Sequence, residues 1–207
     1  MQVRYPLKKH ARPLVASLCT LLVYAGTSAA AEDNTTRLTN SAAKYTEIAT
    51  SWEALLEARQ SRLSYGLRLT DVERYDDYGT VEYVARWSEG DDEDFVWQAN
   101  SWAEFELKVR ELAERDLRLI DVEIYVEEGE AHYLGVWRSG SGNFALWTCP
   151  TWDAFTGRWQ EMLMNGLQLV DIEAYSDPSG THYFGLFRSD INETMLWQDE
   201  DWDEISQ

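Results

Sequence analysis

The strongest constraint on the fold is a tryptophan that returns every 50 residues. The first set consists of Trp52, Trp102, Trp152 and Trp202, and the second of Trp97, Trp147 and Trp197. Leucine, carboxylate and tyrosine positions recur with the same spacing, and the copies align without a gap. A fixed period of this length indicates a tandem-repeat architecture, in which each unit buries its apolar face against its neighbours.

The period divides the chain into segments with different expected roles. We interpret residues 51–100, 101–150 and 151–200 as three repeats. Residues 201–207 begin a partial fourth repeat that could cap the third one. The polar stretch 32–50 is a lead into the first repeat.

Each repeat is expected to be one helix followed by three strands. Ser51, Ser101 and Thr151 precede the periodic tryptophans and are good N-cap residues. Apolar residues then return at helical spacing for ~12–14 residues. Three β-rich stretches follow, separated by turn residues such as Gly129. The predicted fold class is therefore α+β, with three tandem units, each a helix plus a three-stranded antiparallel meander. An all-β propeller is the alternative for this period, but it leaves the helix unexplained.

The first 31 residues have the composition of a secretory signal peptide. Arg4, Lys8, Lys9 and Arg12 precede an apolar run, and small residues 26–31 follow it. We expect cleavage after Ala31 and export to the periplasm or exterior; an uncleaved membrane anchor is the alternative. No later apolar run is long enough to span a membrane.

The charge argues against binding to nucleic acid or anionic membranes, and the cysteine content excludes a disulfide scaffold. Removing the signal leaves 14 basic and 37 acidic residues, a net charge of −23. Such a charge repels nucleic acid and anionic membranes and favours cationic partners. Cys149 is the one cysteine left after cleavage, so the fold is not a disulfide scaffold.

The repeat also resembles a known family. Its pattern is Gly-Leu-x-Leu-x-Asp-(Val/Ile)-Glu-x-Tyr, then His-Tyr-x-Gly-x-(Trp/Phe)-Arg-Ser and two tryptophans. This pattern is similar to the bacterial tandem repeat domain, which is found in exported proteins and in front of β-lactamase-type serine hydrolases such as polyglycine hydrolases. Segments 166–175 and 182–189 match it best, whereas repeat 1 has Glu82, Ala85 and Ser88 at three motif positions. The resemblance implies a fold but no particular activity.

Carboxylate pairs are the first candidate for chemistry. They are Asp71 and Glu73, Asp121 and Glu123, and Asp171 and Glu173. Residues two apart on a strand share a face, and paired carboxylates can perform acid–base catalysis. A catalytic site is needed once, however, and these pairs occur three times. We therefore predict structural carboxylates that accept hydrogen bonds from backbone, Trp or Arg donors. Substitution of each Asp by Asn is then expected to lower the melting temperature comparably.

Recurring aromatic residues are the second candidate. Regularly spaced tryptophans usually fill a core. A binding groove is the hypothesis for six other positions: Tyr75, Tyr125, Tyr175, Trp87, Trp137 and Phe187.

The remaining motifs are weaker. Asp91, Asp92 and Asp94 lie in an acidic loop of repeat 1 that could take calcium, although they lack EF-hand spacing. Ser41 and Lys44 match Ser-x-x-Lys of β-lactamase-type enzymes, but no Lys-Thr-Gly accompanies them. No cofactor or metal is otherwise expected.

These observations favour a non-catalytic binding module that acts outside the cytoplasm on an envelope or extracellular polymer or protein. Two alternatives remain, namely an enzyme of the hydrolase context and a structural or inhibitory partner of an exported hydrolase. Two points are left open: the oligomeric state, and whether the repeats stack linearly or close into a ring.

Overall fold

The computed structural model describes residues 20–24, 45–77, 79–140 and 142–189. These residues form three similar units, each made of a strand, a helix and a two-stranded hairpin. Unit 1 contains β2 (Tyr45–Ala49), α1 (Trp52–Leu63), β3 (Leu67–Asp77) and β4 (Thr80–Glu89). Unit 2 contains β5 (Asp94–Ala99), α2 (Trp102–Ala113), β6 (Leu117–Glu127) and β7 (Glu130–Ser139). Unit 3 contains β8 (Phe144–Cys149), α3 (Trp152–Met164), β9 (Gln168–Asp177) and β10 (Gly180–Arg188).

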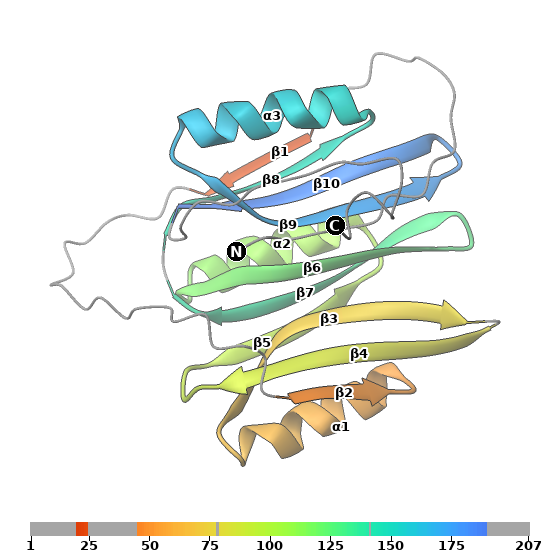
Figure 1. The fold of residues 1–207 in the computed structure, drawn as a ribbon, viewed down its shortest axis with the longest axis vertical. Coiled ribbons are helices and arrows are strands. Elements are labelled where there is room, and N and C mark those ends of the chain that lie inside the picture. The colour runs from red at the N-terminus through yellow and green to blue at the C-terminus, as the bar shows by residue number, and fades with distance from the viewer. Residues whose placement is uncertain (1–19, 25–44, 78, 141, 190–207) are drawn as a thin grey trace, which may run out of the picture.

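The three antiparallel sheets confirm the predicted α+β repeat. Their strand orders are β2-β4-β3, β5-β7-β6 and β8-β10-β9, with the second hairpin strand in the middle. The strand that completes each sheet precedes the helix, so the predicted boundaries at residues 51, 101 and 151 fall between this strand and its helix. Figure 1 shows the three units following one another along the long axis, with β3, β6 and β9 running in the same direction.

The predicted caps begin the three helices. The side chains of Ser51, Ser101 and Thr151 each accept a hydrogen bond from the backbone N–H three residues later. These bonds satisfy N–H groups that have no partner within the helix. None of the helices in the described residues has the length and apolar character needed to cross a membrane.

A two-residue turn closes the hairpin of unit 2. Glu127 pairs with Glu130, and the residues between them, Glu128 and Gly129, have φ values of 52° and 84°. Two successive positive φ values define the turn type whose twist suits antiparallel strands. The predicted Gly129 turn is therefore confirmed, and it fixes which face of β6 each side chain occupies.

Each unit has an aromatic core between its sheet and its helix. Trp137 of β7 and Phe105 of α2 are fully buried, and their rings lie 5.8 Å apart. Gly135 lies under both rings, because a Cβ atom there would come within 2.4 Å of the Trp137 ring and 2.9 Å of Phe105. The glycine of the repeat motif is thus explained by close packing. Unit 1 has Ala85 at this position, and its helix carries the smaller Leu55 in place of the phenylalanine.

One further strand, β1 (Thr20–Tyr24), pairs antiparallel with β8 and extends the sheet of unit 3. β1 lies inside the segment predicted to be the signal peptide, and cleavage after Ala31 would remove this pairing. The partial repeat 201–207 and most of the polar lead lie outside the described residues.

Candidate functional site

A β-bulge in the first hairpin strand positions the repeated carboxylates. The pairing with the second strand shifts between Leu69 and Asp71 in unit 1 and between Leu119 and Asp121 in unit 2, and unit 3 has the same shift. A bulge adds one residue and re-aims the side chains that follow it. We call the six side chains beyond it the inter-unit carboxylates: Asp71, Glu73, Asp121, Glu123, Asp171 and Glu173.

The inter-unit carboxylates connect each unit to the one before it. β3 and β6 are edge strands, and their outward N–H groups need acceptors. The Val72 N–H donates to Asp121 Oδ2 at 3.0 Å, and the Val122 N–H donates to Asp171 Oδ2 at 2.7 Å. The backbone of Arg74 likewise donates to Glu123. Outward N–H groups on a strand recur every second residue, which explains the spacing of the Asp-x-Glu pair.

Burial of these groups changes their acidity. Burial, together with the nearby carboxylates Glu73 and Asp171, raises the pKa of Glu123 to about 9. Burial also raises the pKa of Asp171 to about 7, although the Val122 N–H opposes the shift. Burial likewise raises the pKa values of Asp121 and Glu173 well above their ordinary range. At neutral pH the Glu123 side chain therefore holds a proton.

Unit 1 has no preceding unit among the described residues, and its carboxylates differ accordingly. Asp71 Oδ2 pairs with Arg86 Nη1 at 2.9 Å, and the Arg86 side chain is 47% exposed. Burial raises the pKa of Asp71, and Arg86 opposes that shift. Units 2 and 3 have Val136 and Leu186 in place of Arg86. Sequence reasoning missed Arg86, although comparing the three copies at this position would have revealed the change.

The inter-unit hydrogen bonds agree with the structural interpretation of the carboxylates. The donors across the unit boundaries are backbone N–H groups, and Arg86 donates to Asp71 within unit 1. The predicted indole donors do not take part, because the Nε1 atoms of Trp87 and Trp137 have no hydrogen-bond partner in the described part of the chain. Asp121 is 8% and Asp171 5% exposed, which leaves little access for a substrate.

The aromatic groove hypothesis is wrong for three of its six residues. Trp87, Trp137 and Phe187 are 0% exposed and fill the cores of their units. They point toward their own helix rather than outward, because the bulky ring packs on the motif glycine or alanine and on the helix residue opposite.

The three tyrosines of the same hypothesis differ in their exposure and contacts. Tyr125 is 9% exposed, and the Arg74 guanidinium of unit 1 lies 3.9 Å from its ring centroid. Tyr175 hydrogen-bonds to Tyr133 of unit 2, and burial raises its pKa above the ordinary value. Tyr75 is 52% exposed. Two of the three tyrosines thus join neighbouring units, and Tyr75 alone of the three lies on the surface.

The acidic loop proposed for calcium is engaged by arginines. Asp92 binds the guanidinium of Arg138, with Arg138 Nε at 2.7 Å from Asp92 Oδ2. Asp94 is 3% exposed and binds Arg59 at 2.8 Å. Asp91 is exposed. Among the described residues, no group of three or more His, Cys, Asp or Glu side chains has a metal-binding arrangement.

The Ser-x-x-Lys motif is not placed, and the two histidines of the described residues lie in hairpins. Ser41 and Lys44 lie outside the described residues. His132 contacts Asn100 at 3.2 Å, and His182 contacts Asp177 at 3.1 Å within its own hairpin. Each histidine stacks on the tyrosine across its hairpin at a centroid distance of 5.1 Å.

Alanine substitutions distinguish the three aspartates. Asp121→Ala should lower the free energy of unfolding by about 1–3 kcal/mol because it leaves the Val72 N–H without its acceptor. Asp171→Ala should have a similar effect through Val122. Asp71→Ala should cost less, about 1 kcal/mol, because it loses the ion pair with the exposed Arg86 and a side-chain hydrogen bond with Asp121, but strands no N–H of a preceding unit in the described residues. Urea unfolding checks this order, and equal losses at all three would contradict it.

Comparison with known proteins identifies a family with similar repeats. A family model described as "Polyglycine hydrolase-like, structural repeat" matches residues 100–139 and 151–189. Each match covers a helix and its hairpin in unit 2 or unit 3. A search of curated proteins finds no match.

Proposed function

We propose that this chain, whose second and third units match the polyglycine hydrolase-like structural repeat, is a non-catalytic binding module. In this proposal the protein is exported and binds a polymer or another protein of the cell envelope or exterior. The family description concerns structure rather than chemistry, which is consistent with such a role.

One observation carries the proposal: the recurring chemical groups serve the contacts within and between units. Asp121 and Asp171 accept hydrogen bonds from the preceding unit, and Trp137 fills the core. A side chain used in this way is held by its neighbours and has little freedom to act on a substrate. This supports a scaffold that presents a surface.

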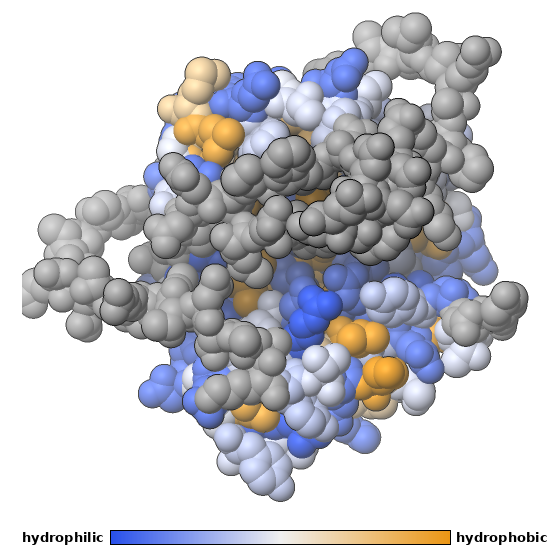
Figure 2. All heavy atoms as spheres, viewed as in Figure 1, coloured by the Kyte–Doolittle hydropathy of each residue, from blue (hydrophilic) through white to orange (hydrophobic). Residues whose placement is uncertain are grey.

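The surface is strongly polar. Figure 2 shows hydrophilic residues over much of the visible face of the described chain, with apolar residues in small groups. Exposed aromatic side chains such as Tyr65 (72%) and Tyr75 (52%) lie among these charges. With a net charge of −23 after removal of residues 1–31, the proposed partner is cationic or carries bound cations.

A second candidate is an accessory partner of an exported hydrolase. The observation that favours it is the description of the matching repeat as polyglycine hydrolase-like. This candidate differs from the first in its ligand, which would be a protein rather than a polymer.

Co-sedimentation tests the proposal. Mature protein is mixed with purified peptidoglycan sacculi, and bound protein and released soluble fragments are measured together. We expect salt-sensitive binding without fragment release, and Tyr75→Ala should weaken this binding. Release of fragments would overturn the non-catalytic role. Failure to bind both sacculi and an exported hydrolase of the same envelope would overturn the binding role.

A further inference from the structure

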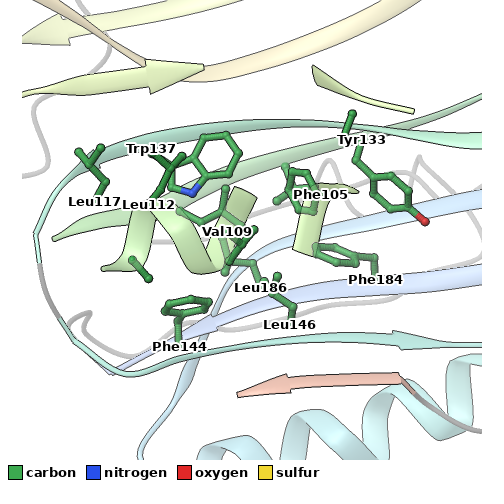
Figure 3. Packing of buried hydrophobic residues seen from close by; sticks show 14 of the residues in the cluster. Phe105, Val109, Leu112, Leu117, Tyr133, Trp137, Phe144, Leu146, Phe184 and Leu186 are labelled. Carbon is green, nitrogen blue, oxygen red and sulfur yellow. The ribbon is translucent and has the colours of Figure 1, made fainter. Parts of the chain in front are cut away.

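The contact between units 2 and 3 shows how a helix is covered by the next unit. Helix α2 lies between the sheet of its own unit and the sheet of unit 3 (Figures 1 and 3). On α2, Val109 is 1% and Ala113 9% exposed. Strand β8 contributes Phe144 and Leu146 to the same buried cluster. The face of α2 that looks toward the next unit is therefore closed in part by the strand that follows the hairpin of unit 2.

One pair of positions in these contacts is matched in each case. Between units 2 and 3, a small helix residue, Val109, shares the cluster with a large strand residue, Phe144. Between units 1 and 2, the equivalent residues are Arg59 and Asp94, which form an ion pair at 2.8 Å. In both contacts the strand residue follows the helix residue by 35 positions. The two pairs are complementary in different ways, so each strand is fitted to its own helix.

A third matched pair follows in the sequence. The equivalent helix residue of unit 3 is Trp159, and the residue 35 positions later is Thr194. A large helix residue thus meets a small strand residue, which reverses the pair Val109 and Phe144. The Thr194 hydroxyl can also accept a hydrogen bond, and the buried Nε1 atom of Trp159 has no partner among the described residues.

The outward face of α3 resembles the covered face of α2. Trp159 and Leu163 occupy the positions of Val109 and Ala113, and both remain partly exposed. Within the part of the chain that the structure describes, no further sheet follows α3. This face is apolar and has the composition of a contact.

The chain leaves unit 3 as it leaves unit 2. The Ser139 N–H donates to the Glu93 carbonyl at 2.9 Å, and the Ser189 N–H donates to the Asn143 carbonyl at 3.0 Å. Strand β8 begins five residues after Ser139, and Thr194 lies five residues after Ser189. The segment that begins at residue 194 therefore has the same reach toward α3 that β8 has toward α2.

We propose that the chain's own segment 194–199 closes the outward face of α3, in the place that β8 takes on α2. Residues 190–207 lie outside the described residues. In the proposed arrangement Thr194 and Leu196 face α3, whereas Met195 and Trp197 face away, because side chains alternate along a strand. This closure removes the face of α3 from the surfaces that an outside partner could use.

Cysteine labelling of the full chain tests the alternation. The background carries Cys19→Ser, which leaves the buried Cys149 as the one native thiol. One cysteine is then added at position 195 or 196. We expect a water-soluble maleimide to react at least about tenfold more slowly with Leu196→Cys than with Met195→Cys, because α3 covers only the first.

Two glutamate variants show which surface covers the segment. Leu163→Glu places a charge on the outward face of α3 and should remove the difference between the two labelling rates. Leu107→Glu is the matched control, because Leu107 lies on α2 and is 70% exposed. This control should leave the difference unchanged.

An exchange of side chains tests the matched pair itself. Thr194→Phe brings a second large ring against Trp159 and should displace the segment, so that Leu196→Cys reacts as fast as Met195→Cys. Adding Trp159→Val copies the pair of units 2 and 3 and should restore slow labelling.

Other outcomes overturn the proposal. Equal labelling of positions 195 and 196 in the otherwise native chain shows that the segment does not lie on α3. A difference that survives Leu163→Glu shows that another surface covers it, and a difference that disappears on dilution shows that it reaches a second copy. If circular dichroism shows that Leu163→Glu does not fold, Leu163→Ser is measured against the same criteria.

Discussion

Replacing Arg59 by valine is expected to lower the free energy of unfolding by about 3–5 kcal/mol, because it strands a buried carboxylate. Arg59 of α1 binds Asp94 at 2.8 Å, and the Asp94 side chain is only 1% exposed. Asp94 Oδ2 also accepts from the Leu69 N–H at 3.1 Å, so the carboxylate stays in place when its partner is lost. Urea unfolding monitored by tryptophan fluorescence measures the loss.

Unit 2 and unit 3 supply the control for this experiment. Val109 and Phe144 occupy the positions of Arg59 and Asp94, and both are buried. The double variant Arg59→Val, Asp94→Phe should therefore regain more than half of the lost stability, since an apolar pair can replace a buried ion pair. A single variant within about 1 kcal/mol of the wild type, or a double variant no better than the single one, would contradict this account.

Stability is also expected to fall as the pH rises from 5 to 9. Asp171 and Glu123 have folded-state pKa values of about 7 and about 9, above the ordinary 3.8 and 4.5. Groups whose pKa is raised by folding stabilise the protein fully below their unfolded-state pKa and lose that contribution as the pH rises through the folded-state value. The loss for Asp171 alone between pH 5 and pH 8 is on the order of 3 kcal/mol. Thermal melting across this range measures it.

Glutamine at position 123 tests the origin of the effect. Gln stays neutral and keeps an oxygen acceptor for the Arg74 N–H, so Glu123→Gln should flatten the decline between pH 7 and 9. Glu130→Gln is the control, because Glu130 is exposed at the hairpin turn. A melting temperature that rises toward pH 9, or an equal response of the two variants, would refute the role of the buried carboxylates.

The repeat and its helix could be predicted from the sequence because they depend on local signals. Ser101 and the apolar spacing after it determine where α2 begins, and Gly129 marks the hairpin turn. The assignment of β5 and β8 to the sheet of the following helix depends on pairing between distant strands. Spacing alone carries no information on which neighbour a strand joins.

The candidate site was predictable in residue type but not in geometry. The threefold recurrence of Asp-x-Glu predicts a structural role, and Asp121 and Asp171 accept hydrogen bonds from the preceding unit. Its partner, the edge strand of the preceding unit, requires knowledge of how the units stack. Trp137 and Tyr125 looked alike as recurring aromatics, yet one fills a core and the other joins two units, because they face opposite sides of their sheet.

The contact between units 1 and 2 contains an ion pair at the positions where the contact between units 2 and 3 has two apolar side chains. This difference limits how the protein can lose a repeat. Excision of one complete copy, residues 94–143, would stack unit 1 directly on unit 3 and bring the Arg59 guanidinium against the Phe144 ring. The carboxylate that neutralises Arg59 would be gone, and Phe144 would lose the contact with Val109. Although the copies resemble interchangeable modules, their junctions are matched in pairs, so shortening by unequal recombination would be disfavoured.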